Sequence, residues 1–139
     1  MIILEKKGNV FEAPGDPHFA HCIASDLRMG AGIAVDFQKR FGLRGKIQAS
    51  GVDTASPTCI LAGRVFNLIT KKRSSGKPTP MSIRLALRAM VKLIPSTKAR
   101  RIAMPRIGCG LDRQSWAVVR AILREELADL DLIIEVYRL

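Results

Sequence analysis

One stretch decides the expected fold, Met104 to Trp116, which reads Met-Pro-Arg-Ile-Gly-Cys-Gly-Leu-Asp-Arg-Gln-Ser-Trp. A strand-like run ends there in two glycines, and an acid and then an amphipathic helix follow. The glycines let a ligand approach the backbone closely, and the start of a helix offers unpaired N–H groups to an anion. The stretch therefore predicts a phosphate-binding turn between a strand and a helix. Asp112 follows the glycines, where it either caps the helix or takes part in proton transfer.

Strand and helix patterns alternate on both sides of this stretch. Short apolar runs bounded by Gly, Pro and polar residues predict strands at 1–4, 19–24, 59–62, 65–70, 101–104 and 132–138. Apolar residues at helical spacing predict helices at 33–41, 81–94 and 115–127, with a short helical turn at 46–50. Strands separated by helices predict a three-layer α/β domain with a mixed sheet, in which ligands bind at the carboxyl ends of the strands.

The size and composition of the chain indicate a single domain over residues 1–139. The mass is 15.3 kDa, and a chain of this size buries about two-thirds of the surface that it exposes when unfolded. No apolar run approaches the roughly 18 to 20 residues that a membrane span needs, and residues 1–7 lack the pattern of a signal peptide. We expect a monomer without membrane contact, in the cytoplasm or the nucleus.

The charge of the chain is strongly positive. Lys and Arg number 23 against 12 Asp and Glu, which gives a net charge of +11. Such a charge attracts polyanions, including nucleic acid, but a solvated basic surface accounts for it equally well. Arg84, Arg88 and Lys92 repeat every four residues on the predicted helix at 81–94. Either solvent and salt or a bound polyanion has to offset their repulsion.

The histidines and cysteines do not form a metal-binding pattern. Cys22, Cys59 and Cys109 are far apart in the sequence and include no Cys-x-x-Cys pair. His18, His21 and Cys22 lie close together but lack the second pair of ligands that a zinc site needs. We expect reduced, partly buried thiols, no metal and no cofactor.

Two further segments carry candidate chemistry. Residues 28–34 read Arg-Met-Gly-Ala-Gly-Ile-Ala and open a helix. Their backbone N–H groups are expected to face a phosphate or a ribose, although the glycine spacing is not that of a dinucleotide fingerprint. Lys71, Lys72 and Arg73 follow a strand, and alternation sends only one of the two lysines into the cleft. Crowding by like charges favours the neutral amine, which can attack an aldehyde carbon, whereas the alternative is a solvated loop.

Three blocks of the sequence resemble the macrodomain family. They are residues 20–34, residues 68–79 with Leu-Ile-Thr-Lys-Lys-Arg and Lys-Pro-Thr, and residues 104–116 with Ile-Gly-Cys-Gly-Leu-Asp. The blocks follow the family's order and span nearly the whole chain. The lysine at position 71 and the Gly-Leu-Asp motif together are specific to the branch of terminal ADP-ribose protein glycohydrolases, and most macrodomains lack this pair. The chain is therefore most similar to that branch.

The resemblance implies a single macrodomain, an α/β/α fold with a mixed sheet of about six strands and ADP-ribose bound across the strand ends. In that branch the lysine matching Lys71 attacks the anomeric carbon of the distal ribose and releases the carboxylate of a modified Glu or Asp. The aspartate matching Asp112 assists proton transfer and helps resolve the lysyl adduct. The implied reactions are removal of mono-ADP-ribose from protein and deacylation of O-acetyl-ADP-ribose. The implied ligand-binding residues are Asn9, Val10, His21, Arg28, Met29, Gly30, Ala31, Gly32, Ile33, Thr70, Pro105, Ile107, Gly108, Cys109, Gly110 and Leu111.

Asn9 departs from the family pattern. The family usually has Gly-Asp after the first strand, with the acid contacting the adenine amino group, whereas this chain has Gly8-Asn9. An amide can still accept that hydrogen bond but lacks charge assistance. The expected cost is about 1 kcal/mol of binding free energy or an altered base preference.

Two alternatives stand beside the hydrolase. One is a non-catalytic reader that binds ADP-ribose and recruits a partner, and the presence of both Lys71 and Asp112 argues against it. The other is a protein that binds nucleic acid or removes ADP-ribose from it, as the net charge suggests. Turnover of a glutamate-linked substrate tests the first alternative, and salt-dependent affinity for nucleic acid tests the second.

Overall fold

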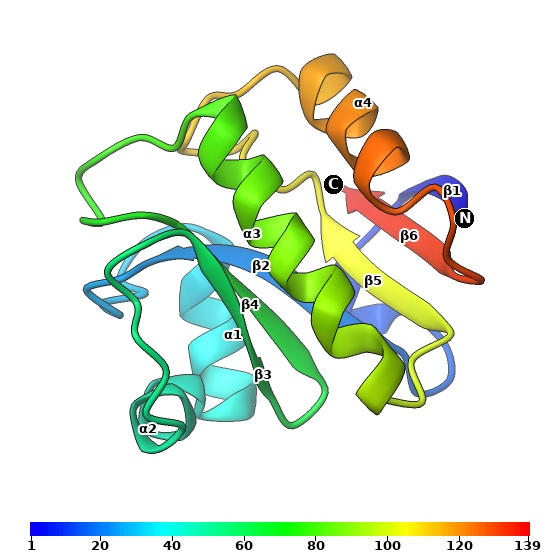
Figure 1. Ribbon diagram of the computed structural model, residues 1–139. Helices are drawn as coiled ribbons and strands as arrows, with labels where there is room; N and C mark the ends of the chain where they lie inside the picture. The colour runs from blue at the N-terminus through cyan, green and yellow to red at the C-terminus, as the bar shows by residue number, and fades with distance from the viewer.

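A computed structural model describes residues 1–139, and one mixed sheet between two layers of helices organises the chain (Figure 1). Its strands are β1 (Ile2–Lys7), β2 (His18–Ala24), β3 (Thr58–Ala62), β4 (Val65–Lys71), β5 (Arg101–Pro105) and β6 (Ile133–Arg138). The order is β1-β6-β5-β2-β4-β3, and only β3 runs antiparallel to its neighbour. The predicted α/β fold with a mixed sheet of six strands is confirmed.

The helices divide between the two faces of the sheet. On one face lie α1 (Ile33–Phe41) and α2 (Leu43–Ala49), and on the other lie α3 (Pro80–Leu93) and α4 (Trp116–Glu126) (Figure 1). The short 3-10 turns η1 (Val10–Glu12) and η2 (Ile94–Ser96) complete the fold. None of these helices has the length and apolar character that crossing a membrane requires.

Local sequence explains where the helices begin and end. In α3, the side chains of Thr79 and Ser82 each accept a hydrogen bond from the other residue's backbone N–H, and Pro80 occupies the first helical position. Gly42 ends α1 in the left-handed conformation, with φ at +59°, and α2 begins directly after it. The helical turn expected at 46–50 therefore starts earlier than predicted. The η1 turn was not predicted, because three residues are too short to show a helical period.

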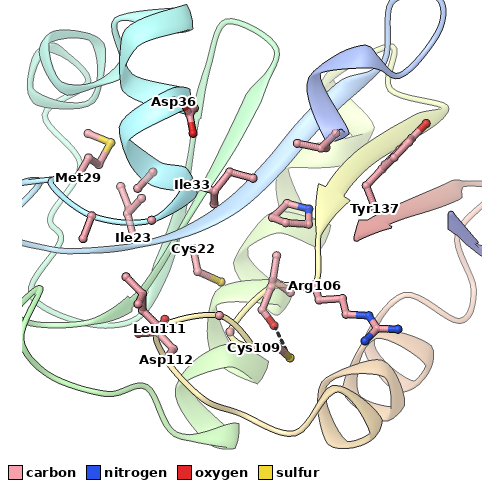
Figure 2. A pocket seen from close by; sticks show the side chains of 18 of the residues that line it. Cys22, Ile23, Met29, Ile33, Asp36, Arg106, Cys109, Leu111, Asp112 and Tyr137 are labelled. Carbon is pink, nitrogen blue, oxygen red and sulfur yellow. Dashed lines mark hydrogen bonds between the residues drawn. The ribbon is translucent and has the colours of Figure 1, made fainter. Parts of the chain in front are cut away.

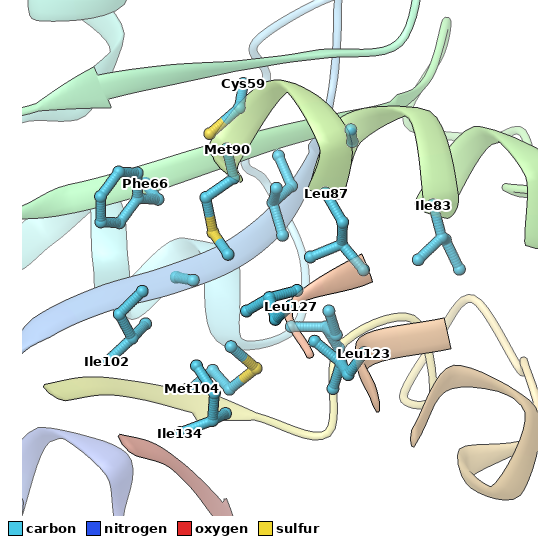
Figure 3. Packing of buried hydrophobic residues seen from close by; sticks show 14 of the residues in the cluster. Cys59, Phe66, Ile83, Leu87, Met90, Ile102, Met104, Leu123, Leu127 and Ile134 are labelled. Atoms are coloured by element: carbon cyan, nitrogen blue, oxygen red, sulfur yellow. The ribbon is translucent and has the colours of Figure 1, made fainter. Parts of the chain in front are cut away.

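Two apolar clusters fill the space between the sheet and the helices. Figure 3 shows the cluster beneath α3 and α4, where Phe66, Leu87 and Met104 are fully buried. The other cluster lies beneath α1 and α2 around Phe37. Since β4 is covered on both faces, all its residues from Val65 to Thr70 are buried, as expected for an inner strand of a largely parallel sheet.

One buried acid joins three strands. The carboxylate of Glu135, on β6, lies 2.5 Å from Lys6 Nζ on β1 and 2.7 Å from the Arg101 guanidinium on β5. Burial acts against ionisation, yet the hydrogen bonds from Lys6 and Arg101 hold the pKa of Glu135 below its usual value. A charge is tolerated there because both cations reach it from neighbouring strands.

Ion pairs between α3 and α4 correct one expectation about the basic helix face. Arg84 Nη1 lies 2.7 Å from carboxylate oxygens of both Glu125 and Glu126, and Arg88 Nε lies 2.7 Å from Glu126. Neither solvent and salt nor a polyanion is needed to offset the repulsion, because α4 supplies the carboxylates. Only Lys92 of the three basic residues has no ion-pair partner, so this face is not a free basic stripe.

Candidate active site

A cavity of about 1020 Å³ opens at the carboxyl ends of the parallel strands. Its walls come from residues that end or directly follow β1, β2, β4, β5 and β6, together with the start of α1. Both glycine loops line it, as the sequence predicted. Figure 2 shows Leu111 and Asp112 on one side of the cavity, Tyr137 on the opposite side, and Ile33 with Asp36 on α1 between them.

The loop between β5 and α4 presents free backbone donors. The N–H groups of Gly108, Gly110 and Leu111 donate to no acceptor within the chain. Gly108 has φ at +72°, and a Cβ atom there would lie 3.0 Å from Ile83 Cδ1, so glycine is strongly favoured at this position. Unpaired amides of this kind can receive an anion.

This loop corrects the expected role of the following helix. The helix begins only at Trp116, with Ser115 at its N-cap. The donors that face the cavity thus belong to the loop rather than to the helix end. Asp112 does not cap α4, which leaves its carboxylate available for chemistry.

Two side chains fasten the loop from the α3 side. Lys77 Nζ donates to the Leu111 carbonyl at 2.6 Å, and Gln114 Nε2 donates to the Pro78 carbonyl at 2.9 Å. Within the loop, the Gln114 N–H donates to the Gly108 carbonyl at 2.8 Å. These three hydrogen bonds hold the loop to its own start and to the segment before α3.

The first glycine loop is held by an arginine. Arg44 Nε donates to the Leu27 carbonyl at 2.7 Å, and Arg44 Nη2 donates to the Arg28 carbonyl. Leu27 and Met29 both have positive φ, at +57° and +47°, and such strain persists only where surrounding contacts impose it. Gly32 starts α1 without a side-chain cap, and the N–H groups of Ile33 and Ala34 in the first turn donate to no acceptor beside the cavity.

Lys71 and Asp112 form an ion pair in the cavity wall. Lys71 Nζ lies 2.6 Å from Asp112 Oδ1, and each side chain is 13% exposed. As predicted, only one of the two lysines enters the cavity, since Lys72 does not line it. The expected crowding by like charges is wrong, because the nearest charge to Lys71 is a carboxylate. Its proton therefore has an acceptor within hydrogen-bonding distance.

A second carboxylate holds the segment that follows Lys71. Asp26 accepts hydrogen bonds from the N–H and the hydroxyl of Ser74, at 2.7 and 2.8 Å, and from the Arg28 N–H at 3.1 Å. The Ser74 carbonyl in turn accepts a hydrogen bond from Lys71 Nζ at 3.2 Å. Partial desolvation raises the pKa of Asp26, but the hydrogen bonds from Ser74 and Arg28 outweigh it and lower that pKa below its usual value. Asp26 thus links the first glycine loop to the position of Lys71.

The two thiols in the cavity wall are not nucleophiles. Burial, with the Asp112 carboxylate nearby, raises the pKa of Cys22 to about 12. Burial also raises the pKa of Cys109, whose Sγ lies 3.4 Å from the Ile107 carbonyl (Figure 2). Both stay protonated at neutral pH. All three cysteines are free, as expected, and no group of three His, Cys, Asp or Glu side chains is placed to hold a metal ion.

Asn9 uses its acceptor within the chain. Its Oδ1 accepts the Phe11 N–H at 2.9 Å and caps η1. The second lone pair of Oδ1 and the NH₂ group make no hydrogen bond within the chain. The expectation that the amide accepts a hydrogen bond from a base therefore stays a prediction, because the oxygen can accept a second bond.

Two predicted ligand-binding residues do not line this cavity. His21 is fully buried, stacks on Phe37 at 4.1 Å between ring centroids, and places Nε2 2.6 Å from Asn67 Oδ1. Burial lowers the pKa of His21 to about 4. Thr70 is also buried and lies beside a second, smaller cavity. The other predicted binding residues all line the main cavity: Asn9, Val10, Arg28, Met29, Gly30, Ala31, Gly32, Ile33, Pro105, Ile107, Gly108, Cys109, Gly110 and Leu111.

The structure adds residues that sequence reasoning missed. The main additions to the cavity wall are Cys22, Ser74, Lys77, Arg106 and Tyr137. Cys22 could have been found, since it lies at the carboxyl end of a predicted strand that leads into a glycine loop. Ser74, Lys77 and Arg106 lie within the blocks that resemble the family but were not predicted to bind, and Tyr137 on the last strand carries no motif of its own.

Comparison with known proteins agrees with this geometry. No model of a protein family matches the chain. ADP-ribose glycohydrolase OARD1 of Bos taurus is 43% identical, over 96% of this chain and 89% of the relative, and the Homo sapiens protein of the same name is 42% identical over the same shares. Among solved structures, the macrodomain of Thermus aquaticus DarG has a TM-score of 0.81 at 24% identity and covers 99% of both chains. The Mycobacterium tuberculosis DarG macrodomain has a TM-score of 0.80 at 19% identity.

The fold is that of a macrodomain. Within that class, the identity to both OARD1 proteins over nearly the whole chain places the protein in one branch. The chain belongs to the family of ADP-ribose glycohydrolase OARD1.

Proposed function

We propose that the protein hydrolyses the bond between ADP-ribose and carboxyl groups, with Lys71 as nucleophile and Asp112 as acid and base. One observation carries the proposal, the contact of 2.6 Å between Lys71 Nζ and Asp112 Oδ1 in the wall of the cavity. Free amides on both glycine loops offer a place for the diphosphate near this pair. A Thermosipho africanus DarTG structure in complex with ADP-ribose, with a TM-score of 0.68, supports the ligand class.

The geometry suggests two steps. Asp112 first takes a proton from Lys71, and the free amine attacks the anomeric carbon of the distal ribose. A C–N bond forms, the C–O bond to the substrate carboxyl group breaks, and the leaving group receives the proton held by Asp112. In the second step Asp112 takes a proton from water, whose oxygen attacks the same carbon while the C–N bond breaks. The proton then returns to Lys71, and free ADP-ribose leaves.

Two substrate types fit this chemistry. ADP-ribose esterified to a Glu or Asp side chain presents a carboxylate leaving group at the anomeric carbon, and O-acetyl-ADP-ribose does so where the acetyl group is on the anomeric oxygen. A non-catalytic reader would have no use for a lysine and an acid held in contact at the ligand. The paired side chains therefore favour catalysis over binding alone.

Single substitutions at Lys71 and Asp112 test the mechanism. Lys71→Ala is expected to abolish release of ADP-ribose from a glutamate-linked peptide while ADP-ribose binding, measured by calorimetry, is retained. Asp112→Ala is expected to slow both steps, since Asp112 accepts a proton in each, and adduct that does form is expected to persist and to increase the intact mass of the protein by one ADP-ribosyl unit. Full activity of both variants would refute the mechanism, and loss of binding in both would show that the pair serves only the fold.

Nucleic acid is a second class of ADP-ribosylated substrate. The net charge of +11 supports it, but the Arg84 and Arg88 pairing with α4 removes the basic stripe that suggested it. Phosphate contacts give an affinity that falls steeply with salt. Absence of oligonucleotide binding at low salt would exclude this class.

A further inference from the structure

A second cavity lies next to the proposed catalytic lysine. It has a volume of about 540 Å³ and shares Lys71 and Lys77 with the main cavity. Its walls are the segment before β3, the end of β4, the connection to α3 and the first turn of α3. A molecule that extends outward from Lys71 therefore meets this cavity directly.

The lining of this second cavity is basic and hydroxylic. It contains no Asp, no Glu and no aromatic residue. Lys72 and Arg73 contribute side chains that are exposed and make no hydrogen bond or ion pair within the chain. Lys71 and Lys77 are engaged elsewhere, with Asp112 and the Leu111 carbonyl. The remaining polar lining consists of the hydroxyl groups of Thr54, Ser56, Thr70, Ser75, Thr79 and Ser82.

This composition favours carboxylates over nucleic acid. Free cations beside hydroxyl donors suit acidic side chains, whereas single-stranded nucleic acid gains much of its affinity from stacking on aromatic rings, which this cavity lacks. The absence of any acid in the lining means that no internal partner competes for Lys72 and Arg73.

We propose that the second cavity binds an acidic segment of the substrate protein next to the modified Glu or Asp. The inference rests on the proposed function, in which the distal ribose meets Lys71 and the modified residue leaves the main cavity at that point. The polypeptide on either side of the modified residue then passes Lys72 and Arg73. Acidic neighbours in the substrate neutralise these two charges, so the enzyme prefers modified residues in acidic sequence contexts.

The test compares two peptides that carry one ADP-ribosylated glutamate. One has glutamates at the flanking positions, and the other has glutamines there. Wild-type protein is expected to show a kcat/KM about tenfold higher on the acidic peptide, mostly through KM, since each exposed charge pair adds a severalfold factor at most. The double variant Lys72→Gln with Arg73→Gln is expected to lose this preference and keep its activity on the neutral peptide. Lys92→Gln with Lys98→Gln removes the same charge from exposed residues outside the cavity and is expected to retain the preference.

The outcomes of this experiment distinguish a failure of the acidic-segment site from a failure of the proposed hydrolase activity. Equal kcat/KM on both peptides, or a preference for the acidic peptide that survives in Lys72→Gln with Arg73→Gln, would refute binding of an acidic segment in the second cavity. The proposed hydrolase activity would be unaffected by either result. No turnover of either peptide would overturn the proposed function itself. An oligonucleotide that competes through Lys72 and Arg73 more strongly than the unmodified acidic peptide would assign the cavity to nucleic acid instead.

Discussion

The substitution Asn9→Asp is expected to tighten ADP-ribose binding. Asn9 Oδ1 already accepts the Phe11 N–H at 2.9 Å, so only a second, uncharged lone pair is left for the adenine amino group. An aspartate keeps the bond to Phe11 with one oxygen and offers the second oxygen as a charged acceptor. Such a bond contributes about 1.5–3 kcal/mol when well desolvated. Asn9 is only half-buried, so we expect about 1–2 kcal/mol, or roughly a 5- to 30-fold lower Kd.

Calorimetry with two ligands checks the reasoning. Inosine diphosphate ribose carries a carbonyl where ADP-ribose carries the amino group, so it accepts from the Asn9 NH₂ and is repelled by an aspartate. The substitution should therefore strengthen ADP-ribose binding and weaken binding of the inosine compound. A Kd for ADP-ribose that is unchanged or higher in Asn9→Asp would refute the placement of the base at Asn9.

Three further predictions follow from contacts around the site and the core. Asp26→Asn is expected to lower kcat about 3- to 10-fold with little change in ADP-ribose Kd, because Ser74 no longer fixes Lys71, whereas Ser74→Ala keeps its backbone contacts and is expected to have a smaller effect in single-turnover kinetics. The free energy of unfolding is expected to fall by up to about 3 kcal/mol from pH 6.5 to pH 4, because the unfolded state takes up a proton that buried His21, with its pKa lowered to about 4, does not. Denaturant titrations should show that this fall in the free energy of unfolding between pH 6.5 and pH 4 is much smaller in His21→Asn and is retained in His18→Asn. Gly108→Ala is expected to cost about 1–3 kcal/mol of stability by the same titrations, because of the positive φ and the approach to Ile83.

Local patterns made much of the site predictable from the sequence. The glycine pairs mark loops at strand ends, and parallel strands bring such loops to one edge of a sheet. Lys71 and Asp112 were paired only through the family resemblance, since 41 positions separate them in the chain. Their contact depends on β4 and the loop after β5 meeting across β2, which no local pattern encodes.

Two of the errors come from partners in distant parts of the chain, and a third comes from the position of a helix end. His21 lies in a glycine-flanked block but faces Phe37 and Asn67, because the face on which a strand residue points depends on what packs there. Arg84 and Arg88 looked unpaired because their carboxylates come from α4. Asp112 looked like a helix cap because loop and helix cannot be separated within a few residues by periodicity.

The contact between Lys71 and Asp112 also bears on how this family can change over time. Each charge is mostly shielded from water, so losing one partner leaves the other uncompensated and costs stability as well as activity. The double replacement Lys71→Ala with Asp112→Ala should consequently be more stable than either single one, a non-additivity that a thermodynamic cycle measures. Members of the family that no longer catalyse the reaction should therefore have replaced both residues, because a protein that keeps only one of them is less stable. A descendant that keeps the glycine loops but has neutral side chains at both positions would be recognisable from its sequence as a former enzyme turned binder.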